Sequence, residues 1–157
     1  IWVRGPQVMQ GYWQNEAETA NVMQDGWFAT GDIAVMDVTG FLRIVDRKKD
    51  MVLVSGFNVY PNEVEDVIAQ MDAVLEVAVV GTPDERTGEA VRAYVVPNPD
   101  HAGALRTEDV LAHCKQHLAA YKRPSSVVLR EELPKSPIGK VLRKDLKAEV
   151  KNEFKRA

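Results

Sequence analysis

This chain of 157 residues is divided into two parts by a run of charged residues, which begins with Asp46-Arg47-Lys48-Lys49. They stand between two apolar runs typical of strands, 41–45 and 51–54, where a strand that builds a core would not place them. A charged run in this position indicates a solvated crossing between two folded bodies. We therefore predict a domain boundary here, with residues 1–48 ending one domain and residues 49–157 forming a second.

The first part, residues 1–45, has the pattern of strands and turns. Apolar runs over 33–38 and 41–45 flank a Thr-Gly turn, which predicts a hairpin, and the segment 14–24 is polar. With no helix of their own to cover them, these strands are expected to belong to the end of a large N-terminal domain. The chain also starts without Met inside an apolar alternation, so we expect a piece cut from a longer protein.

The second part has the pattern of a compact α+β unit. Ser55-Gly56 is a turn-forming pair between short apolar runs, and Pro61 fits the first turn of the amphipathic helix that follows. We predict a fold of class α+β, in which a short hairpin and a three-stranded sheet are covered by helices. The later elements are expected to be strand 74–80, loop 81–89, strand 91–96, a helix capped by Thr107, strand 126–130, and a helix from Arg143 that buries Leu142, Leu146, Val150 and Phe154.

Charge and composition argue against several classes of protein. A net charge of −3 with mixed signs disfavours a nucleic-acid partner, because such binding needs a clear basic excess. No apolar run reaches the roughly 18 residues that suggest a membrane span. The single Cys114 cannot form an internal disulfide and no signal peptide is present, which favours the cytoplasm. A stripe of lysines from Lys140 to Lys155 leaves open a peripheral association with the inner face of the membrane.

A metal site is suggested only superficially. His113 and His117 are four residues apart on an expected helix, with Cys114 beside them. Cys114, however, lies about 100° round the helix from His113 and belongs to the apolar face. No third ligand is evident, so we predict no metal site in this chain.

Three segments carry the most unusual chemistry of the sequence: DGWFATGD at 25–32, DRKKDMVLVSGFNVYPNEVE at 46–65 and LPKSPIGK at 133–140. In order and approximate spacing they resemble the nucleotide motif, the hinge-and-loop region and the C-terminal lysine loop of the AMP-forming acyl-CoA synthetases. That superfamily includes firefly luciferase and the adenylation domains of nonribosomal peptide synthetases. The middle segment is most similar to the bacterial long-chain fatty-acid CoA ligases.

The resemblance implies an enzyme that uses ATP and coenzyme A on a long-chain fatty acid. Acid and ATP give acyl-adenylate and pyrophosphate, and CoA then displaces AMP. Rotation of the C-terminal domain about a hinge, which falls at Lys49, separates the two steps. Mg²⁺ is expected in the full enzyme but not on this piece, and the oligomeric state is not indicated.

Lys140 follows a glycine in a loop that contains two prolines, which presents its ammonium on a stiff arm. The resemblance makes it the catalytic lysine that contacts the acyl carboxylate and the α-phosphate during adenylation. A desolvated cation stabilises the negative charge that builds at phosphorus far better than one in water. From the Gly-Lys pair alone, an exposed surface lysine would be the favoured interpretation.

Thr30, Asp32 and Arg47 are the nucleotide-binding candidates. Asp32 follows Thr30-Gly31 and precedes a strand, where a carboxylate can accept both hydroxyls of a ribose. The resemblance gives it that role and places Arg47 at or near the ribose. Without the family pattern, a turn-stabilising aspartate and a surface arginine would be the simpler interpretations.

The CoA-binding candidates come from the hairpin and two later loops: Ser55, Gly56, Phe57, Gly88, Glu89, Lys122 and Arg123. By resemblance, the hairpin faces the active site in the second half-reaction, beside the pantetheine channel. Gly56 lets another group approach the backbone closely, and a tight turn needs the same residue. Leu53 stands where luciferase-like relatives often carry Lys, so their thioester-step contacts do not transfer in detail.

Two other functions remain open from the sequence. An adenylation domain could pass the acyl group to a carrier-protein thiol, and a small α+β module could bind a partner without catalysis. The phosphate loop and the acyl pocket, which the resemblance places upstream, are missing from this chain. We therefore expect the piece alone to be inactive, and its acyl chain-length preference cannot be inferred.

Overall fold

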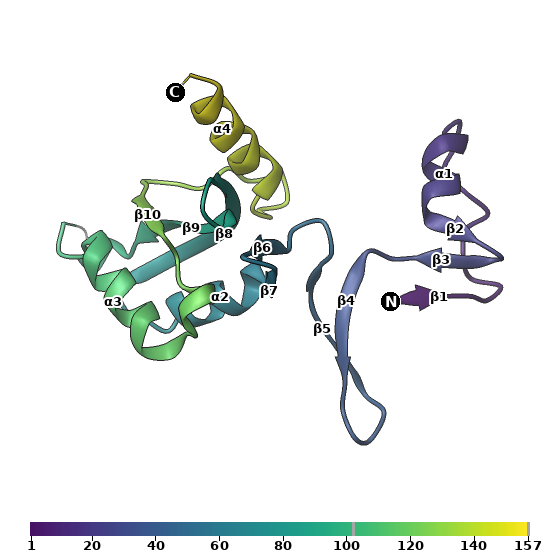
Figure 1. The fold of residues 1–157 in the computed structure, drawn as a ribbon, viewed down its shortest axis with the longest axis horizontal. Helices are drawn as coiled ribbons and strands as arrows, with labels where there is room; N and C mark the ends of the chain where they lie inside the picture. Colours follow the sequence, from purple (N-terminus) through teal and green to yellow (C-terminus); the bar gives the residue numbers. More distant parts are fainter. Residues whose placement is uncertain (102, 157) are drawn as a thin grey trace. The chain divides into compact units, whose positions relative to one another are not determined.

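The computed structural model describes residues 1–101 and 103–156, and they divide into two compact units. The first unit is Ile1–Lys49, and the second begins at Asp50. Figure 1 shows the helices and strands of each. The role of the first unit as the end of a larger domain, and that of Lys49 as a hinge, stay predictions.

The first unit contains a small antiparallel sheet and one helix. The sheet has the order β1 (Trp2–Val3), β3 (Trp27–Ala29), β2 (Met23–Gln24). The helix α1 (Glu16–Val22) corrects the expectation that these strands have no helix of their own. Asn15 caps α1 by accepting a hydrogen bond from the backbone N–H of Glu18, and the acidic first turn suits the positive end of a helix.

The predicted hairpin of the first unit is present as β4 (Asp32–Met36) and β5 (Leu42–Arg47). The predicted solvated run is exposed at Arg47, Lys48 and Lys49, but Asp46 is buried, and β5 continues through Asp46 and Arg47. Asp46 is only 2% exposed, and its carboxylate accepts the N–H of Arg47 at 2.7 Å. The pairing shifts register between Ile33 and Ala34, next to the partner of Asp46.

The sheet of the second unit has five strands. The long strands β8 (Val74–Asp84) and β9 (Gly88–Pro97) are antiparallel, and β10 (Ser126–Leu129) runs parallel to β9. The hairpin of β6 (Val52–Val54) and β7 (Phe57–Val59) joins the same sheet, because Val54 pairs with Gly88. The expected three strands and the expected hairpin are therefore parts of one sheet.

The expected loop over 81–89 is largely strand. β8 runs to Asp84 and β9 starts at Gly88, which leaves a turn of three residues. The Asp84 carboxylate closes this turn by accepting the backbone N–H groups of Arg86 and Thr87 and the hydroxyl of Thr87. The bond from the Thr87 side chain is the main cause that lowers the pKa of Asp84. The turn-forming residue types of this segment suggest a loop, but residues 81–84 are strand because they pair with β9.

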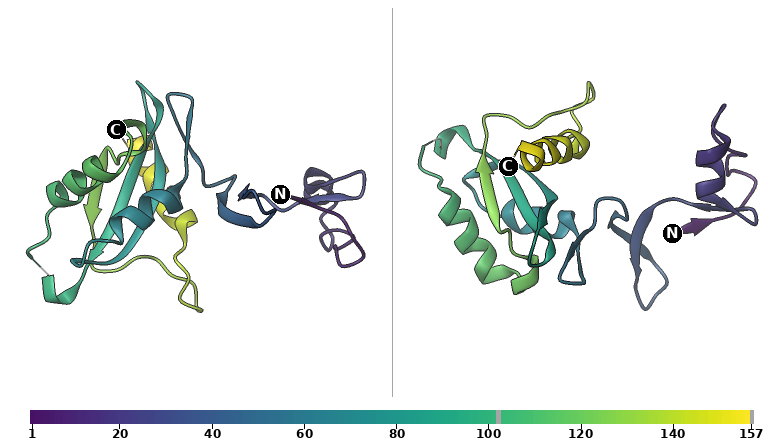
Figure 2. Two further views of the ribbon diagram at one scale, coloured as in Figure 1. Left: turned by 90° about the horizontal axis from the view of Figure 1, so that it is seen from below. Right: turned by 45° about the horizontal axis from the view of Figure 1, so that its top comes forward.

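Two core clusters lie on opposite faces of this sheet. Alternate residues of β9 divide between them, as the pleat of a strand requires: Val91, Ala93 and Val95 face one cluster and Tyr94 and Val96 the other. The first cluster packs under α2 (Pro61–Ile68) and α3 (Thr107–His117), and the second under α4 (Arg143–Arg156). Figure 2 shows the resulting layers of the second unit, with the sheet in the middle. Two short 3₁₀ turns, η1 (Pro99–His101) and η2 (Ala120–Lys122), precede α3 and β10.

Two predicted details of the helices were wrong. Arg106, not Thr107, is the N-cap of α3, because the Asp109 carboxylate reaches back to the N–H of Arg106 and pairs with its guanidinium. On α4, Leu146 and Val150 are fully buried, but Phe154 is 48% exposed. The buried members of the second cluster end at Val150, one turn before Phe154. Within the described residues, no helix is long and apolar enough to cross a membrane.

Candidate functional site

Lys140 lies in a short, ordered loop that leads into α4. The loop is closed at its base by an isolated bridge between Lys135 and Val141. Inside it, the N–H of Ser136 donates to the carbonyl of Lys140 at 2.8 Å, and the N–H of Lys140 donates back to the Ser136 hydroxyl at 3.1 Å. Gly139 takes a φ of +79°, which an L side chain rarely adopts. The backbone of the predicted catalytic residue is thus held, while its side chain is exposed.

The Lys140 ammonium has no carboxylate partner among the described residues. Other lysines of the second unit differ in this respect, since Lys135 pairs with Glu76 and Lys147 pairs with Asp50. A cation without an internal partner on an ordered backbone can meet an anionic ligand without first breaking an ion pair. This arrangement suits electrostatic stabilisation of a phosphoryl or carboxylate group.

The nucleotide candidates lie together in the first unit. Asp32 and Arg47 face each other across β4 and β5, and the Arg47 Nε lies 3.1 Å from Asp32 Oδ1. The Thr30 hydroxyl accepts the N–H of Asp32 at 3.1 Å, and the carbonyl of Gly31 accepts the N–H of Lys48 at 2.8 Å. A carboxylate has about four acceptor positions, so Asp32 can hold Arg47 and still accept two hydroxyls.

The tip of the β6–β7 hairpin is a tight turn with an aromatic neighbour. Ser55 and Gly56 have φ values of +50° and +85°, the pattern of the two-residue turn that matches strand twist. A Cβ on Gly56 would meet no atom of the described residues within 4 Å, so these residues leave the space beside the turn open. Next to it, the ring of Phe57 stacks on Tyr121 of η2 with centroids 4.7 Å apart. Tyr121 directly precedes the CoA candidates Lys122 and Arg123 in the sequence, but only the fold shows that it lies beside the hairpin.

The second pair of CoA candidates, Gly88 and Glu89, lies against this hairpin. The N–H of Ser55 donates to the carbonyl of Thr87 at 2.8 Å. The Glu89 carboxylate accepts the N–H of Leu53 at 2.7 Å. The structure therefore brings the hairpin and the β8–β9 turn together as one hydrogen-bonded group, although 36 residues separate Leu53 from Glu89. Their roles toward CoA stay predictions.

Lys122 and Arg123, the cationic candidates for CoA, both have partners within the fold. The Lys122 ammonium pairs with Glu63 in the first turn of α2. The Arg123 Nε donates to the carbonyl of Leu118 at 2.9 Å. These contacts hold η2 against α2 and the end of α3. A ligand that recruited either cation would compete with them.

The histidine pair on α3 is used in backbone contacts. His113 Nε2 lies 3.0 Å from the carbonyl oxygen of Val67, and His117 Nδ1 lies 2.9 Å from that of His113. Cys114 is buried in the first core cluster, and this burial raises the pKa of its thiol to about 11. Among residues 1–101 and 103–156, no group of three metal-binding side chains gathers.

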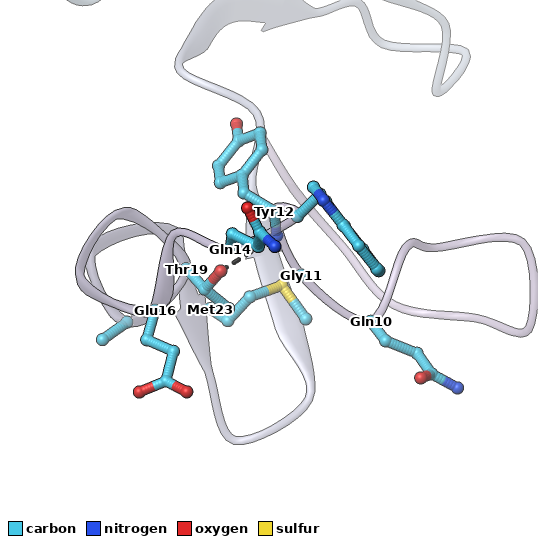
Figure 3. A pocket seen from close by; sticks show the side chains of 9 residues that line it. Gln10, Gly11, Tyr12, Gln14, Glu16, Thr19 and Met23 are labelled. Carbon is cyan, nitrogen blue, oxygen red and sulfur yellow. Dashed lines mark hydrogen bonds between the residues drawn. The ribbon is translucent and has the colours of Figure 1, made fainter.

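A hollow in the first unit was not anticipated from the sequence. Figure 3 shows it beside α1, where the Thr19 hydroxyl accepts the N–H of Tyr12 at 2.9 Å. The available signal was the aromatic pair Tyr12-Trp13 in a polar segment, and Trp13 is almost fully exposed. The lining residues are Gln10, Gly11, Tyr12, Trp13, Gln14, Glu16, Thr19, Ala20 and Met23.

Known proteins match this chain in sequence and in structure. Residues 63–140 match the AMP-binding enzyme C-terminal domain. The Long-chain-fatty-acid–CoA ligase of Yersinia pestis is 59% identical over 149 residues, which are 95% of this chain and 26% of that ligase. The chain thus spans about a quarter of the length of this curated relative.

Two solved structures share the fold. ATP-bound MatB from Rhodopseudomonas palustris has a TM-score of 0.87 and 36% identity, over 96% of this chain and 30% of the MatB chain. The o-succinylbenzoate CoA synthetase of Bacillus subtilis, in complex with its acyl-adenylate intermediate, has a TM-score of 0.83 and 36% identity, over 93% of this chain and 29% of its own. Residues 63–140 therefore belong to the AMP-binding enzyme C-terminal domain family, and the chain as a whole is similar to the long-chain-fatty-acid–CoA ligases.

Proposed function

We propose that this chain is the C-terminal part of a long-chain fatty acid:CoA ligase. The full protein joins a fatty acid to ATP, releases pyrophosphate, and then transfers the acyl group from AMP to the thiol of CoA. The observation that carries the proposal is the 59% identity to a ligase of that name along 95% of the chain. The carrier-protein alternative has no comparable support.

Lys140 acts in the first half-reaction. Attack of the fatty-acid carboxylate on the α-phosphate builds negative charge at phosphorus, and pyrophosphate leaves. An ammonium that enters a water-excluded site stabilises this charge strongly. This role is supported by the ordered loop around Ser136 and Gly139 and by an ammonium that has no carboxylate partner in the described part of the chain.

Asp32 and Arg47 hold the nucleotide. Asp32 accepts the two ribose hydroxyls, while Arg47 fixes the carboxylate from the opposite strand. Thr30 fixes the turn through the N–H of Asp32. Mg²⁺ is expected with the phosphates of ATP in the full protein, held by groups outside this chain.

The hairpin group acts in the second half-reaction. The open space beside Gly56 gives the pantetheine arm access to backbone, and Phe57 with Tyr121 offers an apolar wall. Rotation about Lys49 exchanges the Lys140 loop for this group at the acyl-adenylate. The location proposed for the full protein is the cytoplasm, with peripheral association at the inner face of the membrane through the exposed lysines of α4.

The test uses the full-length protein and separates the half-reactions. Fatty-acid-dependent ATP–pyrophosphate exchange measures the first, and CoA thioester formed from supplied acyl-AMP measures the second. Lys140→Ala should lower the exchange rate by about two orders of magnitude or more and leave the second step nearly unchanged. Equal loss in both steps would mean that Lys140 is structural. Lys144→Ala, an exposed lysine on the first turn of α4, is the matched control.

A further inference from the structure

A polar cluster lies directly behind the Lys140 loop. Arg143, the first residue of α4, donates from Nε to Glu65 Oε1 at 3.1 Å and from Nη2 to Glu65 Oε2 at 2.5 Å. The same Nη2 donates to Asn62 Oδ1 at 2.6 Å. This is the two-pronged arginine–carboxylate geometry, which is both strong and directional. The helix that carries the lysine loop is thereby attached to α2.

Glu65 connects this pair to the sheet as well. Its Oε1 also accepts the backbone N–H of Val79 in β8 at 2.7 Å. The side chains of Arg143 and Glu65 are only 22% and 17% exposed. Removing one partner of an ion pair that is shielded in this way lowers the stability of the fold much more than removing one partner of an exposed pair. One carboxylate therefore fixes the start of α4 relative to both α2 and β8.

The loop's own hydrogen bonds do not fix its direction. The pairs between Ser136 and Lys140, and from the N–H of Leu142 to the carbonyl of Pro134, hold its internal shape. Where the loop points relative to the rest of the second unit depends on its two ends. One end is the buried Leu133, and the other is the first turn of α4. Arg143 supplies the polar attachment at that second end.

We propose that Arg143 is a positioning residue for Lys140: through Glu65 and Asn62 it sets the direction in which the loop presents the ammonium. The inference rests on the proposed role of Lys140 in adenylation. A misplacement of a catalytic group by about 1 Å can cost about a hundredfold in rate, so loosening this attachment should act on the first half-reaction. The second half-reaction does not use Lys140 and should be spared.

The same helix offers a matched control. Farther along α4, Glu149 pairs with Arg130 and Glu153 pairs with Arg92. Those pairs also hold α4 to the sheet, but they lie one turn or more beyond Arg143. Arg130→Met removes an ion pair of the same chemical type, together with the contact of its guanidinium with the Tyr94 ring, and leaves Arg143, Glu65 and Asn62 in place. It should therefore lower stability without a selective effect on adenylation.

The experiment compares Arg143→Met with Arg130→Met in the full-length enzyme. Arg143→Met should lower the kcat of ATP–pyrophosphate exchange by about ten- to a hundredfold, with the rate of thioester formation from supplied acyl-AMP changed by less than about threefold. Arg130→Met should change neither rate by more than about threefold. If Arg143→Met lowers both rates equally, or neither, the positioning role is wrong.

A double variant gives the sharper readout. In a Lys140→Ala background, Arg143→Met should lower exchange no further, because Arg143 acts through Lys140. If the losses in exchange rate of the two single variants multiply in the double variant, the proposal is wrong and Arg143 has only a structural role. Arg143→Lys keeps the charge but cannot make the two parallel hydrogen bonds to Glu65, so it should show the same selective loss of exchange rate, reduced in size. It provides the test if Arg143→Met does not fold. If Lys140→Ala itself leaves exchange intact, the proposed function fails instead.

Discussion

The two units of the chain differ in what covers their apolar side chains. In the second unit, residues such as Val79, Ile68 and Leu146 are fully buried in two clusters on either face of a five-stranded sheet. In the first unit, Val38, Phe41 and Ile44 are exposed on a two-stranded hairpin. Isolated two-stranded hairpins are at best marginally stable in water. From this difference we infer that the buried cores of the second unit supply most of the folding stability of the chain. The hairpin of the first unit needs further contacts to be stable.

Core truncation should give the largest contrast between the units. Ile68→Ala removes a fully buried side chain between α2 and the sheet and should lower the free energy of unfolding by about 2–5 kcal/mol. Ile44→Ala, the same change at an exposed site, should cost less than about 0.5 kcal/mol. Urea unfolding followed by circular dichroism measures both. Similar losses at the two positions would mean that the hairpin is covered in solution.

Restricting the backbone between the units should have a smaller effect, which falls on the rate of one half-reaction and not on the stability of the fold. Lys49→Pro fixes φ near −65° and removes an amide donor at the unit boundary. In the full-length enzyme, one half-reaction should slow by about tenfold or more relative to the other, because the hinge residue absorbs the change in φ and ψ. Lys48→Pro is not a suitable control, since its N–H bonds to Gly31. Lys49→Ala is a suitable control. If Lys49→Pro has small and equal effects on the two half-reactions, the hinge lies elsewhere.

Ligand binding by the chain alone should show the smallest effect. Asp32 and Arg47 lie in one unit and Gly56 and Lys140 in the other. We predict that each pair supplies only part of a ligand site of the full protein. A partial site cannot bury most of a ligand's surface as specific pockets do. Titration calorimetry of residues 1–157 with ATP, CoA and a non-hydrolysable acyl-adenylate analogue should therefore detect no binding at micromolar concentrations. Micromolar binding of any of them would favour the binding-module interpretation.

Much of the second unit could be predicted because its signals are local. Pro61 and the apolar spacing behind it determine α2, and Ser55-Gly56 determines the hairpin turn. The failures lie where distant partners decide. Residues 81–84 have the composition of a loop, but pairing with β9 makes them strand. Phe154 has the spacing of a core residue, yet the cluster beneath α4 ends a turn earlier.

The candidate site shows the same division. The sequence singled out Lys140, Asp32 and Gly56 because motif and glycine patterns are contiguous. It could not reveal that Tyr121 lies beside Phe57 or that Arg143 pairs with Glu65, because those partners are 64 and 78 residues apart and meet only in the folded structure. Supporting residues are harder to predict than reactive ones, since no short motif marks them.

The hydrogen bond from the N–H of Val79 to Glu65 also protects the edge of β8 against pairing with a strand of another molecule. Among the described residues β8 pairs only with β9, so its other edge has no strand partner. Val79 and Pro83 are four residues apart, so their backbone nitrogens point toward the same edge of β8, because successive backbone N–H groups alternate between the two edges of a strand. At that edge the N–H of Val79 is occupied by the Glu65 carboxylate, and Pro83 has no N–H to offer. Edge strands protected in these ways resist the intermolecular pairing that leads to aggregation.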